Sequence, residues 1–350
     1  MRLPEPVSEI PVLTPARPEP ASYATADEAV AAVIALYDEA TAFLRERFGA
    51  VMGGAEVEGR YRAFYPRIQM TTQSFSRVDS RLAFGHVPDP GTYAATISRP
   101  DLFRNYLTQQ LGLLIDNHGV SIQVDLSDTP IPLHFALPEG AHVEGSIEER
   151  IGRPLRDVFD VPDLNITNDA IVNGVAQADE EGRRPLAPFT AQRVDYALAR
   201  LAHYTATSPS HFQNHVLFTN YQFYMDEFVT YAHEALAAGD YDAFVEPGNR
   251  VTTRDGVTGE AAAKLPQMPT YHLTRADGSG ITMVNIGVGP SNAKTITDHI
   301  AVLRPHAWLM LGHCAGLRHS QNLGDYVLAH AYVREDHVLD DDLPVWVPIP

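Results

Sequence analysis

Two stretches of the sequence decide the predicted fold: ITMVNIGVGPSNA (281–293) and AWLMLGHCAGL (307–317). Each begins with an apolar run of strand length that ends in a glycine-containing loop, which predicts a buried strand followed by a turn. In the first loop, Gly287 and Gly289 let the backbone approach a ligand closely. The second loop runs from Gly312 to Gly316 and includes the dipeptide His-Cys. Both stretches therefore predict a strand that ends in a loop able to contact a ligand.

A helix is predicted between the two strands. Pro290 suits the first helical position, and Ser291 suits the first turn, where free N–H groups point into the loop. The residues that follow place an apolar face at helical spacing: Ile296, Ile300 and Leu303. Two strands joined by one helix are expected to be parallel, which brings both loops to the same edge of the sheet. Open α/β sheets bind ligands at that edge, so the sequence predicts a binding site there.

Composition limits the classes of function. A chain of 350 residues is long enough for two domains, and its 45% hydrophobic and 20% charged content is typical of a globular protein. The net charge of −18 argues against a nucleic-acid partner. The one cysteine, Cys314, excludes an intramolecular disulfide and a cysteine-based zinc site. With neither a signal peptide nor an apolar run of membrane-spanning length, we expect a cytoplasmic protein without a membrane partner.

The sequence pattern of the N-terminal half predicts an α+β domain over residues 26–185. Residues 1–22 are rich in proline and glutamate. We therefore expect residues 1–25 to form a disordered lead-in. Helices are predicted from Asp27 to Arg47 and from Arg99 to His118. Strands are predicted over 59–70, 80–85, 91–97 and 120–126.

We place the domain boundary near Pro185, after a segment rich in Pro, Gly, Asp and Glu, and assign residues 186–350 to the second domain. Helices are predicted over 190–203 and from Tyr221 to about Leu236. Further strands are predicted over 215–218, 241–245, 271–274 and 324–331.

Several side chains at the strand ends could contact a ligand. The loop with Gly289, Ser291 and Asn292 lacks the Gly-Lys-Ser/Thr of a phosphate loop and the third glycine of a dinucleotide fingerprint, so a plain turn is the alternative to a ligand loop. Asn220 and Tyr221 end another strand and could face the same crevice. We also assign a candidate phosphate-binding set at the end of the 241–245 strand: Gly248, Asn249 and Arg250.

The pair His313-Cys314 allows two interpretations. A catalytic thiolate needs a base or a positive environment that lowers its pKa, and sequence neighbours on a loop point in different directions. We therefore favour Cys314 as a small buried residue lining a pocket. His313 is equally compatible with a substrate contact and with a structural role. The acidic cluster 340–342 is interpreted as a solvated surface, and we expect no metal site.

Several motifs together resemble the AMP nucleosidase family, and the resemblance covers nearly the whole chain after residue 25. They are RPxLFRxYL (99–107), LFTNYxxYxDEF (217–228), VNIGVGPSNAK (284–294), GHCxGLR (312–318) and GDYVLAHA (324–331). The resemblance implies an N-terminal domain concerned with regulation and assembly, followed by an α/β/α domain of nucleoside-phosphorylase type. It also implies hydrolysis of AMP to adenine and ribose 5-phosphate. The loops around Asn220, Gly289 and Gly312 would then form the phosphate, ribose and base pocket.

Two departures from the superfamily pattern matter. Related phosphorylases carry an Arg two residues before the third loop's glycine; here that residue is Met310, which suits water as the nucleophile. The Met-Glu motif that holds the ribose hydroxyls and the Ser-Asp segment that protonates the leaving purine do not occur in the second domain before Pro350. We therefore expect the chain to be a C-terminal truncation, with its catalytic residues beyond Pro350.

Two other functions compete with AMP hydrolysis. A purine nucleoside phosphorylase would release adenine only with inorganic phosphate, and a catalytically inactive protein would bind the nucleotide or regulate without cleaving it. For the complete enzyme the resemblance implies a homo-hexamer, activation by Mg-ATP and inhibition by inorganic phosphate, with no cofactor required.

Overall fold

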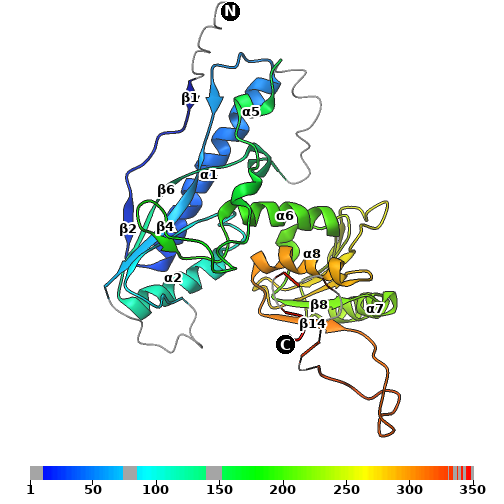
Figure 1. Cartoon of the computed structure of the whole chain (residues 1–350). Coiled ribbons are helices and arrows are strands. Elements are labelled where there is room, and N and C mark those ends of the chain that lie inside the picture. The colour runs from blue at the N-terminus through cyan, green and yellow to red at the C-terminus, as the bar shows by residue number, and fades with distance from the viewer. Residues whose placement is uncertain are drawn as a thin grey trace, which may run out of the picture. The chain divides into compact units, whose positions relative to one another are not determined.

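The computed structural model describes residues 11–73, 85–138, 152–329, 331–333, 337, 340–341 and 344–347 (Figure 1). The chain divides into two compact units, Met1–Ala199 and Arg200–Pro350. This division falls inside helix α6 (Ala191–Thr205), which follows the predicted boundary at Pro185. The predicted mixed α/β class is confirmed.

The first unit contains a five-stranded sheet in the order β2-β6-β4-β5-β7. Its strands are β2 (Ala21–Tyr23), β6 (Ile122–Pro130), β4 (Phe64–Thr72), β5 (Gly91–Thr96) and β7 (Arg184–Pro185). Neighbouring strands are antiparallel except β5 and β7, which are parallel. The short β7 therefore ties a distant part of the chain to the edge of the sheet.

Two long helices, α1 (Ala26–Met52) and α2 (Arg104–His118), pack on this sheet. Thr25 caps α1, because its hydroxyl accepts the N–H of Glu28 and donates to the Glu28 carboxylate at 2.8 Å. The buried face of α1 repeats at helical spacing: Val30, Val33, Tyr37, Ala40 and Leu44. Gly119, with φ of 64°, ends α2 in the left-handed conformation that glycine adopts most easily.

Shorter elements complete the first unit. They are β1 (Val12–Leu13), which pairs in parallel with β3 (Arg60–Tyr61), the helices α3 (Leu133–Ala136) and α5 (Leu155–Val158), and the 3-10 helix η1 (Leu164–Ile166).

The first unit differs from the predictions in three places. The expected disordered lead-in contains β1 and β2, because sheet partners satisfy its backbone groups. The single strand expected over 59–70 is two strands, and α2 begins at Arg104 because Arg99 adopts a left-handed φ of 45° and 101–103 form turns. The strand expected over 80–85 falls outside the described residues except for Gly85, which is not in a strand.

The second unit is built on a seven-stranded sheet in the order β11-β10-β9-β12-β13-β8-β14. Its strands are β8 (His215–Thr219), β9 (Ala243–Glu246), β10 (Arg250–Thr253), β11 (Gly256–Thr258), β12 (Thr270–Thr274), β13 (Ile281–Asn285) and β14 (Ala307–Leu311). Both β13 and β14 run parallel to β8, which lies between them. The predicted parallel arrangement of β13 and β14 is therefore confirmed.

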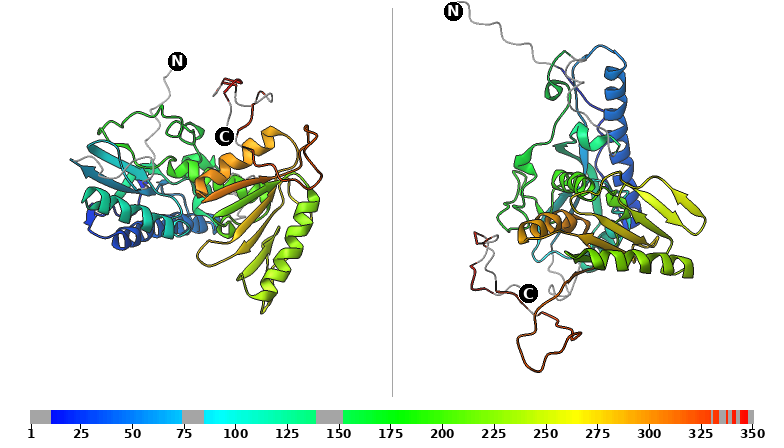
Figure 2. Two further views of the ribbon diagram at one scale, coloured as in Figure 1. Left: turned by 90° about the horizontal axis from the view of Figure 1, so that it is seen from below. Right: turned by 90° about the vertical axis from the view of Figure 1, so that its right-hand side faces the viewer.

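Helices cover this sheet from both sides. Figures 1 and 2 place α7 (Gln222–Ala238) and α8 (Pro290–Ile300) on opposite faces. The apolar side of α7 packs against three buried sheet residues: Phe244, Leu273 and Met283. The predicted core role of Phe228 is confirmed, because it belongs to this cluster. The 3-10 helices η2 (Pro209–His211) and η3 (Ala301–Leu303) precede β8 and β14.

One predicted strand of the second unit is wrong. Residues 324–329 and 331 form no strand, and their side chains are exposed to solvent, including those of Tyr326 and Leu328. None of the described strands pairs with these residues, and apolar alternation alone does not produce a strand. No helix in the described part of the chain is both long and apolar enough to cross a membrane.

Candidate active site

The candidate site lies where the direction of the chain connections reverses in the second unit. Strands β8 and β13 are parallel neighbours, yet the helices that follow them cover opposite faces of the sheet (Figure 2). The loops at the two strand ends therefore lead to opposite faces of the sheet, and the point where they diverge is the usual ligand position in open α/β sheets. This topology brings together the loop with Asn220, after β8, and the loop with Gly289, after β13.

The β8 loop contributes Asn220 and Tyr221, both of them exposed. Thr219, the last residue of the strand, is buried, and its hydroxyl accepts the N–H of Tyr221 at 3.2 Å. Tyr221 occupies the N-cap position of α7, and its side chain makes no capping hydrogen bond. The free N–H groups of the first turn of α7 thus begin at this loop.

The β13 loop is held to the β8 loop by hydrogen bonds. The N–H of Ile286 donates to the carbonyl oxygen of Thr219 at 2.9 Å, and the Asn285 amide donates to Gln222 at 3.4 Å. The other end of the Asn285 side chain accepts the N–H of Gly287 at 3.0 Å. Asn285 therefore fixes the turn and links it to the start of α7.

The same loop leads into α8. Gly287 and Gly289 have φ angles of 67° and 109°, so both positions use the conformational freedom of glycine. Pro290 is the first helical residue, as predicted, and α8 has no side-chain cap. The backbone N–H groups of Ser291 and Asn292 lie in this uncapped first turn, which favours an anionic group.

The third loop, after β14, also reaches the start of α7. A side-chain nitrogen of His313 (Nε2) lies 3.0 Å from the hydroxyl of Tyr224, and the imidazole centre is 4.6 Å from the Tyr221 ring. The ring of Phe223 stacks on the same imidazole at 6.2 Å. A side chain at Gly312 would lie 3.9 Å from Tyr221. The structure therefore brings Tyr221, Gly312 and His313 together.

The interpretation of Cys314 as a buried residue is wrong. Its free thiol is exposed. It follows β14, the last strand of the described sheet, and residues 312–329 are exposed in a segment without helices or strands. A loop that does not pack against a second layer cannot bury its small residues.

The turn with Gly248, Asn249 and Arg250 lies between β9 and β10. Strand β9 runs in the same direction as β13, because both are antiparallel to β12, so this turn follows the same edge of the sheet. The Asn249 side chain accepts the N–H of Ser208 at 2.7 Å, and Arg250 forms an ion pair with Glu246 at 3.2 Å. Both side chains thus already have partners within the unit, and their role in phosphate binding stays a prediction.

Sequence reasoning missed Asn285, Gln222 and Tyr224 as parts of the site. Tyr224 lies three residues after Tyr221, so helical spacing could have indicated that the two rings share one face of α7. The contact between Tyr224 and His313 joins positions 89 residues apart and had no local signal.

The three loops provide hydrogen-bond donors and aromatic rings but no carboxylate. None of the residues 219–224, 285–293 and 311–318 is Asp or Glu. Within the described ranges, no group of three His, Cys, Asp or Glu side chains could hold a metal ion. This arrangement can bind an anionic group and a flat ring, and it leaves a carboxylic acid to be supplied from elsewhere.

Known proteins resemble this chain in both halves. A family model described as "Bacterial AMP nucleoside phosphorylase N-terminus" matches residues 28–183. The AMP nucleosidases of Escherichia coli K12 and Escherichia coli O157:H7 are each 44% identical over 329 residues, which cover 90% of this chain and 67% of theirs. The chain thus spans about two thirds of the length of these relatives.

Among solved structures, AMP nucleosidase from Bacteroides thetaiotaomicron VPI-5482 is 26% identical, with a TM-score of 0.34. The match covers 45% of this chain and 55% of that one.

Proposed function

This chain belongs to the AMP nucleosidase family, and from that membership we propose that the complete protein hydrolyses the N-glycosidic bond of AMP. The products are adenine and ribose 5-phosphate. The observation that carries the proposal is the 44% identity to the two E. coli enzymes over 90% of the chain.

The geometry of the second unit supports binding of a nucleotide monophosphate. The uncapped first turn of α8, at Ser291 and Asn292, offers N–H groups and a positive helix end to the 5′-phosphate. The rings of Tyr221 and His313, 4.6 Å apart, offer an aromatic surface to adenine. The two features lie on loops that meet at one sheet edge, so one ligand can contact both.

The bond cleavage needs groups beyond these contacts. Positive charge develops on the ribose and negative charge on the departing adenine, so a carboxylate near the sugar and an acid near the base both lower the barrier. Because the described loops carry no carboxylate, we propose that these groups belong to the third of the family sequence that the chain does not span.

The test is adenine release by the complete protein, measured by chromatography with and without inorganic phosphate. We expect adenine and ribose 5-phosphate without added phosphate. Release that requires phosphate and yields a sugar 1,5-bisphosphate would contradict the proposal in favour of a phosphorylase. Tight AMP binding without release would favour an inactive nucleotide-binding protein.

We further propose Mg-ATP as an activator, inorganic phosphate as an inhibitor and a homo-hexamer as the assembled form. Adenine-release rates with each effector and the mass of the assembly by light scattering test these three points separately.

A further inference from the structure

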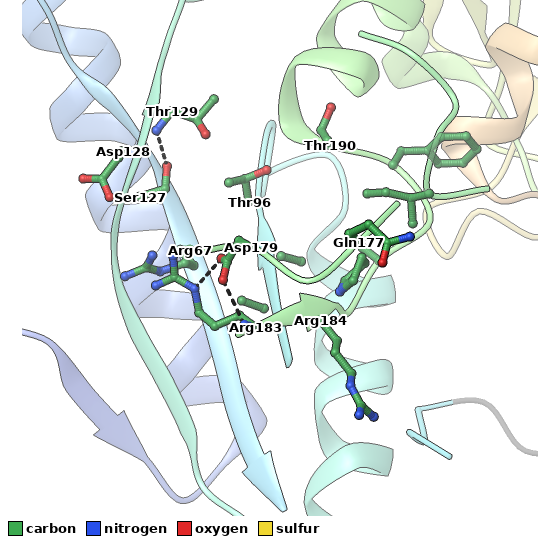
Figure 3. A pocket seen from close by; sticks show the side chains of 16 residues that line it. Arg67, Thr96, Ser127, Asp128, Thr129, Gln177, Asp179, Arg183, Arg184 and Thr190 are labelled. Atoms are coloured by element: carbon green, nitrogen blue, oxygen red, sulfur yellow. Dashed lines mark hydrogen bonds and ion pairs between the residues drawn. The ribbon is translucent and has the colours of Figure 1, made fainter. Parts of the chain in front are cut away.

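One cavity lies entirely within the first unit. It has a volume of about 310 Å³, within the range of small-ligand pockets. Its floor comes from strands β4, β5 and β6, and its cover comes from the segment 171–190. Figure 3 shows polar side chains from these separate elements around one space, among them Arg67, Thr96, Ser127, Asp179 and Arg183.

The lining is rich in arginine although the whole chain has a net charge of −18. Arg67, Arg183 and Arg184 line the cavity, against two aspartates, Asp128 and Asp179. Both aspartates already have partners. Asp128 accepts from Arg17 at 3.0 Å, and Asp179 accepts from the side chain of Arg183 at 2.7 Å.

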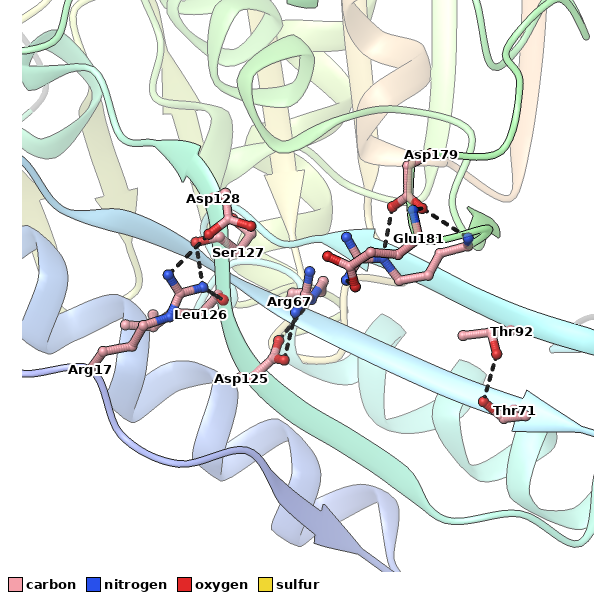
Figure 4. A network of polar contacts seen from close by, with 11 residues as sticks. Arg17, Arg67, Thr71, Thr92, Asp125, Leu126, Ser127, Asp128, Asp179 and Glu181 are labelled. Atoms are coloured by element: carbon pink, nitrogen blue, oxygen red, sulfur yellow. Dashed lines mark hydrogen bonds and ion pairs between the residues drawn. The ribbon is translucent and has the colours of Figure 1, made fainter.

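Carboxylates hold two of these arginines in place (Figure 4). Nε and Nη2 of Arg67 donate to Asp125 at 2.8 and 2.7 Å. Nε of Arg183 donates to Asp179, and its Nη1 donates to Glu181 at 2.6 Å. The exposed fraction of each arginine side chain is 13%. Both guanidinium groups are thus partly buried and anchored, so a ligand would meet them with little further loss of side-chain entropy.

The anchoring leaves donors unused. A guanidinium has five N–H donors, and the bonds above occupy only part of each fork. In the part of the chain that the structure describes, Nη1 of Arg67 and Nη2 of Arg183 have no hydrogen-bond partner. The hydroxyl of Thr129, on the same lining, also makes no hydrogen bond there. These three groups are donors that a bound ligand could engage.

We propose that this cavity binds a small anion rich in acceptor oxygens, carrying phosphate or carboxylate groups, with Arg67 and Arg183 as its principal donors. Guanidinium donors make short, strong hydrogen bonds to such oxygens, and partial burial weakens competition from water. The site is separate from the candidate active site, since all its residues belong to the first unit, and it does not depend on AMP hydrolysis.

The adjacent arginine supplies a matched control. Arg184 contributes to the lining, but Figure 3 shows its side chain extending away from Asp179 and Thr96. Its Nη1 donates to the hydroxyl of Tyr93 at 3.2 Å instead. An Arg→Lys change at any of the three positions keeps the net charge and removes the planar set of N–H donors. This loss should weaken anion binding at Arg67 and Arg183, which face the cavity, and not at Arg184.

The experiment is calorimetric titration of the 350-residue chain with pyrophosphate and, separately, citrate, at constant ionic strength. We expect at least one probe to bind. The probe that binds more tightly shows whether the cavity prefers phosphate or carboxylate groups. R67K and R183K should each weaken this binding about tenfold, and R184K less than twofold. Circular dichroism melting establishes that each variant is folded.

Should a lysine variant fail to fold, T129V removes one hydroxyl without altering charge or shape and should weaken binding about threefold. Binding of neither probe at millimolar concentration would overturn the proposal. Equal affinities for R67K, R183K and R184K would overturn it as well, because the bound anion would then lie outside this cavity.

Discussion

Asp195 is a buried carboxyl group that the predicted function does not use. It is 4% exposed and lies in the first unit, where the hydroxyl of Tyr65 donates to it at 2.5 Å and the hydroxyl of Ser98 donates to its other oxygen. Burial raises the pKa of Asp195 to about 7, although the two hydrogen bonds act in the opposite direction. At the residue scale, this group makes the stability of the first unit depend on pH.

The direction of that dependence follows from the two pKa values. In the unfolded chain the carboxyl releases its proton near pH 4, while in the folded chain it keeps the proton until about pH 7. The folded state therefore binds the extra proton between these values, and the free energy of unfolding falls as pH rises through this window. The total fall is at most roughly 4 kcal/mol, and the free energy stays level above the folded pKa.

D195N should remove this component. Urea unfolding followed by circular dichroism at pH 5 and pH 8 should show a smaller pH difference for D195N than for the wild type. Both tryptophans, Trp308 and Trp346, lie in the second unit, so their fluorescence provides an internal control that should not change. Identical pH differences in the two proteins would show that Asp195 is ionised in the folded chain across this range.

At the scale of the element, the start of α8 depends on one backbone conformation. Gly289 combines φ of 109° with ψ of 149°, a region that residues with a side chain rarely adopt. A Cβ at this position would meet no atom within 4 Å, so any cost of a side chain there comes from the backbone alone. The direction of the free N–H groups of Ser291 and Asn292 follows from this turn.

G289A should therefore destabilise the second unit by about 1–3 kcal/mol and weaken AMP binding. The matched change is G49A in α1, where a Cβ also meets nothing within 4 Å but the backbone is helical. G49A should leave the free energy of unfolding of the first unit unchanged or raise it by about 0.5–1 kcal/mol. Urea unfolding measures both, by tryptophan fluorescence for G289A and circular dichroism for G49A. A neutral G289A would mean that the turn can rearrange freely.

At the scale of the whole molecule, the candidate active site and the arginine-lined cavity belong to different units. The second unit carries the loops of the candidate active site, and its sheet ends, among the described strands, at β14, where Trp308, Leu309 and Met310 are each more than 40% exposed. Side chains on both faces of this strand are thus left uncovered. The family relatives contain further sequence, since this chain spans 67% of their length.

We expect the 350-residue chain to release adenine from AMP at least about 100-fold more slowly than the E. coli AMP nucleosidases, because the three loops carry no carboxylate and a general acid alone is worth that much. Parallel assays at equal concentration measure the ratio, with circular dichroism to establish that the shorter chain is folded. Equal rates would place the acid among the 350 residues and direct attention to His313, whose ring contacts Tyr221 and Tyr224.

Local sequence determined most of the framework of the second unit. The apolar runs of β13 and β14, the proline at the start of α8 and the glycines before it depend on backbone geometry and side-chain periodicity, which neighbouring residues set by themselves. The parallel direction of β13 and β14 and their shared sheet edge followed from the single helix that joins the two strands, whereas the position of β8 between them did not. The family motifs also lie in these stretches, so fold and family could both be predicted from the sequence.

Only the tertiary structure decided which distant side chains meet. The contact of His313 with Tyr224, the exposure of Cys314 and the arginine-lined cavity of the first unit join or expose residues that no local pattern relates. Such contacts depend on strand order, register and the layers that cover each sheet, which are properties of the whole packed chain. The failed strand over 324–331 has the same cause, because alternating apolar residues become a strand only beside a partner strand.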